Sequence, residues 1–110
     1  MDIREIASLV EQETGISWPE MRLNARRGEI VFARQLVMTF ARKYTVLSRR
    51  QIGKPFGRDG ATVFHAEKTI SDLCETDKRI NSIFRRINTK VWHGLQYQDF
   101  EDMCNNCVQL

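Results

Sequence analysis

The sequence has few prolines and cysteines and no long apolar segment. It has two prolines, Pro19 and Pro55, and three cysteines, an odd number without the regular spacing of a disulfide framework. No apolar run approaches the ~18 residues of a membrane span. The opening residues 1–15 carry acidic side chains, unlike a signal peptide. These absences argue against a secreted or membrane protein, and we expect a cytoplasmic one.

The chain also lacks repeats and the Pro-, Gly- or Ser-rich stretches that separate domains. A chain of 110 residues can bury roughly 65% of its unfolded surface, which suffices for one core without a metal or a disulfide. We expect one domain over residues 1–94, followed by a tail over residues 95–110 that could form a short helix.

Acidic residues are nearly missing from the middle of the chain. Residues 24–58 contain nine basic side chains and one acid, Glu29, which gives this segment a net charge of +8. Because the whole chain has a net charge of +3, the remaining residues have a net charge of −5. A local positive field flanked by acidic segments is typical of a surface that meets a polyanion. A solvated basic face without a partner is the plainer interpretation.

What the chain does have is helical periodicity. Apolar residues recur at steps of three and four, the period of an amphipathic helix. The expected helices cover residues 2–14, a short segment after Ser17, and residues 28–44, 48–55, 59–76 and 77–93. The fold class is therefore all-α, with six or seven helices.

Capping residues mark where these helices begin. Ser17 with Glu20, and Ser48 with Gln51, have the spacing of a capping box. The other N-cap candidates are Asp2, Asp59 and Asp77, and Gly15 is a candidate stop signal.

The same periodicity predicts core positions. The inward series are Val63, Ala66, Ile70 and Leu73 in residues 59–76, and Ile80, Phe84, Ile87 and Val91 in residues 77–93. We expect Trp18 and Trp92 to anchor the core.

Residues 48–55 and 59–76 form two helices joined by a tight turn containing glycine, the outline of a helix-turn-helix. Arg49 and Arg50 begin the first helix, where side chains and backbone amides can both meet phosphates. In the second helix the core series leaves Gly60, Ala61, Thr62, His65 and Lys68 on the outward arc. Gly60 and Ala61 would let the backbone approach another surface closely.

The segment "IGKPFGRDGATVFHA", residues 52–66, resembles the signature of the C-terminal DNA-binding domain of the bacterial replication initiator DnaA. Residues 24–48 resemble the basic loop and long helix of that domain, so the resemblance covers roughly residues 3–92. It implies a Trp-repressor-like helix-turn-helix that binds double-stranded DNA in the major groove. It also implies a basic-loop arginine in the minor groove and a role in replication initiation or its regulation.

The resemblance also implies roles for single residues. Arg26, or Arg27 if the loop shifts, would enter the minor groove, Arg34 and Gln35 would touch backbone and base edges, and Lys43 a phosphate. His65 occupies a signature position, and on a polar helix face it is either solvated or contacts a phosphate. The full predicted DNA-binding set is Arg26, Arg27, Arg34, Gln35, Lys43, Arg49, Arg50, Arg58, Asp59, Gly60, Ala61, Thr62, His65 and Lys68.

The chain departs from the family pattern in two ways. Gly60 and Ala61 replace the usual His-Thr, which removes hydrogen-bonding groups and leaves open which DNA sequence is recognised. No G-x-x-x-x-G-K-[ST] loop is present, so the chain resembles a stand-alone DNA-binding domain without the ATPase module. We expect no enzyme activity, cofactor or metal site.

Two rival interpretations remain. The chain could be a helical interaction module whose basic face docks an acidic protein partner, such as a replication protein. Cys104-x-x-Cys107 could hold a metal or act in redox chemistry, although a single pair without further ligands is a weak signal. The oligomeric state is open.

Overall fold

The computed structural model describes the backbone of residues 1–108 and the side chains of residues 1–95. Every regular element in this part of the chain is helical. The elements are α1 (Ile3–Thr14), α2 (Trp18–Met21), α3 (Gly28–Tyr44), α4 (Arg49–Gly53), a 3-10 turn η1 (Lys54–Phe56), α5 (Gly60–Thr76) and α6 (Lys78–Val108). The expected all-α class with six or seven helices is confirmed, with six α-helices in residues 1–108.

The helix boundaries follow from local capping. Asp2 caps α1 by accepting from the Glu5 amide, and both expected capping boxes, at Ser17 and at Ser48, are complete. Gly15 ends α1 in the left-handed region at φ 75°, where a side chain would be strained. These contacts span three residues or fewer, so the sequence alone could predict them.

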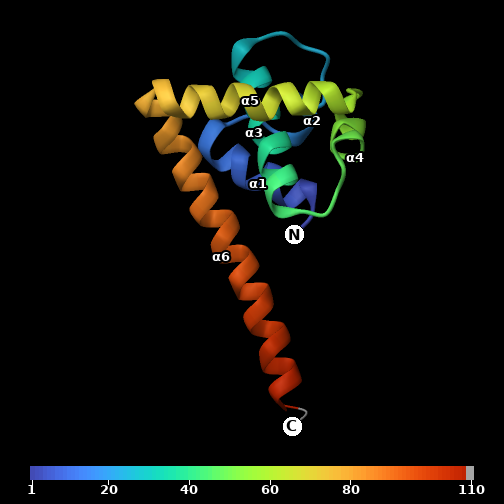
Figure 1. Cartoon of the computed structure of the whole chain (residues 1–110), viewed down its shortest axis with the longest axis vertical. Helices are drawn as coiled ribbons and strands as arrows, with labels where there is room; N and C mark the ends of the chain where they lie inside the picture. The colour runs from blue at the N-terminus through green and yellow to red at the C-terminus, as the bar shows by residue number, and fades with distance from the viewer. Residues whose placement is uncertain (109–110) are drawn as a thin grey trace.

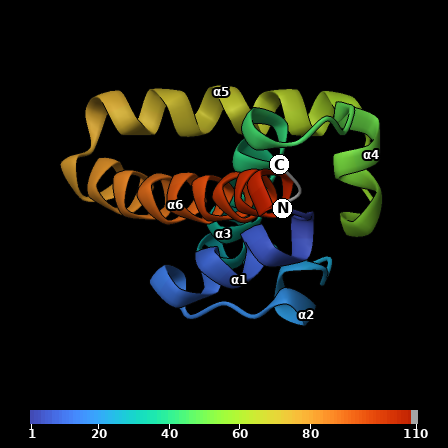
Figure 2. The same ribbon diagram turned by 90° about the horizontal axis from the view of Figure 1, so that it is seen from below.

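Helix α3 is the centre of the molecule. It contacts α1, α2, α4 and α5, while α6 packs on α1 and α5. In Figure 1, α5 lies across the outer side of the bundle, and α6 runs away from it toward the C-terminus. Figure 2 shows the first part of α6 beside α5 in the perpendicular view. One long face of α5 is therefore left uncovered.

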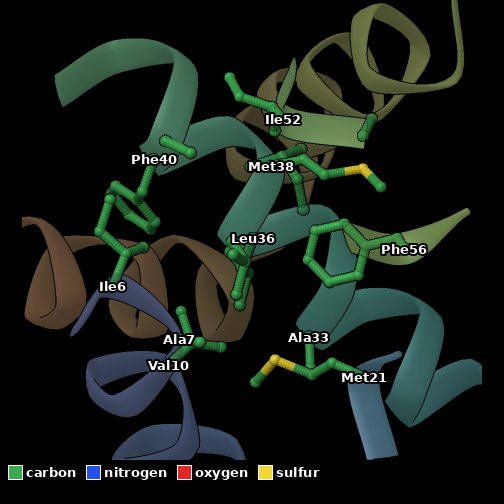
Figure 3. Packing of buried hydrophobic residues seen from close by; sticks show 14 of the residues in the cluster. Ile6, Ala7, Val10, Met21, Ala33, Leu36, Met38, Phe40, Ile52 and Phe56 are labelled. Carbon is green, nitrogen blue, oxygen red and sulfur yellow. The ribbon is translucent and has the colours of Figure 1, made fainter. Parts of the chain in front are cut away.

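The core forms where α1, α3, α5 and α6 meet α2 and α4, and Figure 3 shows part of it from close by. Leu36, Val37 and Phe40 of α3 are completely buried, and Ile6 and Val10 of α1 pack against the same cluster. Burying a side chain of this size contributes about 1.5–3 kcal/mol. This cluster fixes α5 on α3 and so determines which residues of α5 face outward.

Burial along α5 and α6 differs in part from the expected series. Val63, Ala66 and Ile70 are buried, whereas Leu73 is half-buried because it lies near the end of α5. Trp92 was expected in the core but is 51% exposed. Val91 takes the inward position, and one residue further along a helix points about 100° away.

Helix α6 is one element of 31 residues, and it does not end near residue 93 as the sequence suggested. Gly94 lies within it, since an interior glycine weakens a helix by about 1 kcal/mol without breaking it. The later turns extend beyond the other helices (Figure 1). The side chains of these later turns, including those of Cys104 and Cys107, lie outside the described residues.

Ionic contacts attach α6 to α1. Glu13 accepts from Arg86 Nε at 2.9 Å and from Lys90 Nζ at 3.1 Å. The hydrogen bonds from Arg86 and then Lys90 lower the pKa of Glu13. Across residues 1–108, no helix combines the length and hydropathy needed to span a bilayer.

Candidate nucleic-acid interface

The turn between α4 and α5 is built on Gly53. A Cβ at this position would lie 2.6 Å from the Arg58 carbonyl oxygen, and the Arg58 amide donates to the Gly53 carbonyl at 3.0 Å. Gly57 completes the turn with φ 66°, in the region that favours glycine. The backbone of the turn thus approaches Gly53 too closely for a side chain. The two helices are thus held as a compact helix-turn-helix.

Asp59 caps α5. Its Oδ1 accepts from both the amide and the hydroxyl of Thr62, each at 2.9 Å. These hydrogen bonds, backbone first, lower the pKa of Asp59, so the carboxylate is charged at neutral pH. The carboxylate here satisfies one of the exposed amides at the start of α5, that of Thr62.

The outward face of α5 carries most of the predicted reading residues. Ala61, Thr62, His65 and Lys68 are all exposed. Gly60 differs, because it is half-buried and a Cβ there would lie 3.4 Å from the Arg50 amide nitrogen. Gly60 therefore packs against α4 at ordinary van der Waals distance, and it also lines an open hollow beside the turn.

Arg34 is the clearest difference from expectation. The sequence placed it among the residues that touch DNA, yet it is only 6% exposed. Its two terminal nitrogens donate to the carbonyls of Leu23 at 2.9 Å and Ala25 at 3.1 Å. Burial, and then the charge of Arg58, lowers the pKa of Arg34. In this arrangement Arg34 holds the loop that follows α2.

That loop is brought against the helix-turn-helix. Arg58 Nη2 donates to Asn24 Oδ1 at 2.9 Å, which links the turn to the loop. A hollow of about 250 Å³ lies between the loop, α3 and α5. Its lining includes Arg26, Arg34, Gln35, Arg58, Thr62 and His65, six of the predicted DNA-binding residues.

A second hollow, of about 580 Å³, opens beside the turn. It is lined by Arg50, Lys54, Gly57, Arg58, Asp59 and Gly60. Arg58 borders both hollows, so the positive charge is continuous from the loop to α4. Arginines held this close repel one another, and a bound polyanion would relieve that repulsion.

Arg49 is not a free cation. Its Nε donates to Glu67 Oε2 at 2.7 Å, and this hydrogen bond raises the pKa of Arg49. Sequence reasoning missed Glu67 as a partner because 18 residues separate the two. It also missed Asn24 and the exposed Phe64, although the helical period already placed Phe64 outside the core series.

Lys43 and Arg27 are among the predicted residues that line neither hollow. Lys43 Nζ donates to Asn88 Oδ1 of α6 at 3.3 Å and lies 5.2 Å from the Tyr44 ring centroid. Arg27 is exposed and forms a 3.5 Å ion pair with Glu29. Lys43 therefore faces α6, away from the residues that meet at Arg58.

Comparison with known families identifies this arrangement. The family model described as "Bacterial dnaA protein helix-turn-helix" matches residues 3–70, more than half of the chain. The chain belongs to this family of DNA-binding helix-turn-helix domains. All fourteen residues of the predicted DNA-binding set fall within the matched segment, which runs from α1 into the middle of α5.

Chromosomal replication initiator proteins DnaA from several bacteria are similar to this chain. The protein of Flavobacterium psychrophilum is 43% identical over 72 residues, 64% of this chain and 15% of the relative. That of Bacteroides fragilis is 36% identical over 88 residues, 79% of this chain and 18% of the relative. That of Nostoc sp. is 32% identical over 87 residues, 78% of this chain and 19% of the relative. The chain thus spans less than a fifth of the length of each of these initiators.

Membership of the DnaA helix-turn-helix family agrees with the chemistry of the described side chains. Within residues 1–95 no group of three or more His, Cys, Asp or Glu side chains could hold a metal ion. Five of the side chains that line the two hollows are cations: Arg26, Arg34, Arg50, Lys54 and Arg58.

Proposed function

We propose that this chain binds double-stranded DNA, with α5 in the major groove and the loop at Arg26 in the minor groove, and acts in the initiation of replication or its regulation. The observation that carries the proposal is the convergence at Arg58. Residues from the loop, from α3 and from α5 line a single basic hollow there. Such a protein would be located at the nucleoid.

Phosphate binding would come from the exposed cations around the helix-turn-helix. Arg50 and Lys54 flank the turn, and Lys68 lies further along α5. The N-terminus of α5 adds backbone amides and the positive end of a helix dipole. These contacts orient the protein on the duplex and carry no sequence information.

Base recognition would come from the first turns of α5. Both hydrogen bonds within the Asp59 cap use Oδ1, which leaves Oδ2 to accept from a cytosine amino group. Thr62 and His65 supply hydrogen-bonding groups, and Ala61 supplies a methyl. Gln35 and Arg26 border the same hollow and extend the contact toward the minor groove.

Binding to a random duplex library at several salt concentrations tests the proposal. If roughly six to eight phosphates are neutralised, log K falls with log[salt] with a slope of about −5 to −7. Sequencing of the bound fraction then shows whether bases are read. Binding that is indifferent to salt, or no binding to any duplex, would contradict the proposal and favour an acidic protein partner for the basic face.

A further inference from the structure

Phe64 is an aromatic side chain on the uncovered face of α5. It is 51% exposed, although its neighbours Val63 and Ala66 are buried. Single exposed apolar residues are common on protein surfaces. Phe64 is unusual because it lies on the helix whose N-terminal turns would enter the major groove.

The phenyl ring is held between two cationic or polar neighbours. Arg49 Cζ lies 5.2 Å from the Phe64 ring centroid, and the His65 ring lies 6.0 Å away in an edge-on arrangement. Arg49 is itself fixed by Glu67, one turn further along α5, through contacts of 2.7 and 3.5 Å. The ring therefore has a defined orientation before any ligand arrives.

Phe64 also has an apolar neighbour on the helix surface. Residues three and four apart on a helix lie next to each other, so Ala61 borders Phe64 one turn earlier. Both side chains are exposed. Together they form an apolar strip between the hydrogen-bonding groups of Thr62 and His65 on one side and the Arg49–Glu67 pair on the other.

Only one kind of apolar group projects into the major groove from unmodified bases, the C5-methyl of thymine. We infer that Phe64, together with Ala61, reads the C5-methyl groups of thymines at adjacent positions of the DNA site. The inference rests on the proposed function and names the part of the base that the site recognises. Arg49 and Glu67 are then positioning residues for the ring.

The inference explains why Arg49 is neutralised by an acid on a DNA-facing helix. Glu67 would repel phosphates if its charge were free. When Glu67 is paired with Arg49, it holds the Arg49 guanidinium next to the Phe64 ring, and the pair has little net charge.

Replacing thymine by deoxyuridine tests this directly, because the change removes the methyl and nothing else. We would take a duplex selected from a random library and replace each thymine in turn. Losing one buried methyl contact, worth ~0.8 kcal/mol, is expected to weaken binding about fourfold at one or two adjacent positions. In Phe64→Ala the ratio of thymine to deoxyuridine affinity at one of these positions should fall to about 1. Arg49→Gln should lower the same ratio in part.

Val46→Ala is the control, since Val46 is a fully exposed apolar side chain on the loop after α3, outside the helix-turn-helix. It should keep the wild-type ratios. Ratios of about 1 at every thymine in the wild-type protein, or an unchanged ratio in Phe64→Ala, would overturn the inference while leaving DNA binding intact. Failure to bind any duplex would overturn the proposed function and this inference with it.

Discussion

Arg58 and Asn24 lie 34 residues apart in the chain, and the Arg58 guanidinium donates to the Asn24 side chain at 2.9 Å. This contact joins the turn of the helix-turn-helix to the loop that carries Arg26. In the proposed complex the two segments enter different grooves, so their spacing must match the duplex. The hydrogen bond helps to set that spacing before DNA binds.

Arg58 and Arg26 should respond differently to substitution. Arg58→Ala should weaken binding to all duplexes and reduce the salt slope by about 1, because it removes a phosphate contact. Arg26→Ala should chiefly reduce the preference for A·T-rich flanks, since a narrow minor groove attracts arginine. Mobility shift on duplexes with A·T or G·C flanks measures both effects. If Arg26→Ala loses the same amount of affinity for duplexes with A·T flanks and with G·C flanks, the minor-groove assignment is contradicted.

Arg34→Ala should destabilise the fold by about 1–3 kcal/mol, because the buried guanidinium and its two part-buried hydrogen bonds to the carbonyls of Leu23 and Ala25 are lost. Urea unfolding followed by circular dichroism measures this free energy. Arg42→Ala is the control on the same helix. Arg42 also donates to a carbonyl, that of Leu47, but it is exposed, and its loss should change stability by no more than about 0.5 kcal/mol. If the two variants lose similar amounts of unfolding free energy, Arg34 does not hold the loop.

Gly53→Ala should destabilise the helix-turn-helix by about 1–3 kcal/mol, because the new Cβ would meet the rigid backbone of Arg58 and force the turn to move. Gly28→Ala, at the start of α3, has no atom within 4 Å of the new Cβ. That variant should be neutral or gain up to about 1 kcal/mol by restricting the unfolded chain. Thermal unfolding of the two variants side by side tests the contrast, and a neutral Gly53→Ala would be inconsistent with the close approach.

Stability should fall in acid because of the contact between α1 and α6. The pKa of Glu13 in the folded protein lies below its ordinary value of 4.5, since Arg86 and Lys90 donate to the carboxylate. A carboxyl group with a lowered pKa binds protons more readily when unfolded, so its contribution is complete above that ordinary value and is lost as the pH falls through the folded-state pKa. Glu13→Gln should be less stable than wild type at pH 7, and the difference should shrink toward pH 3. A difference that stays constant over this range would rule out the linkage.

Much of the fold could be predicted from the sequence because its signals are local. The Ser17 and Ser48 capping boxes and the Asp59 cap each join residues three apart. The limits of α3 and α5 follow from apolar periodicity. The end of α6 was predicted too early, near residue 93, because the glycine at position 94 weakens a helix without ending it.

The amino-acid sequence by itself determined the helices, their caps, the helix-turn-helix and the family, since each depends on residue types at short, fixed spacing. Only the tertiary structure decided what several side chains contact. It buried Arg34 beneath the loop, paired Arg49 with Glu67, turned Gly60 toward α4 and left Phe64 and Trp92 exposed. The physical reason is that these environments depend on how separate helices pack together. Periodicity along one helix shows which face is apolar, but it does not show which neighbouring groups will lie within hydrogen-bonding distance.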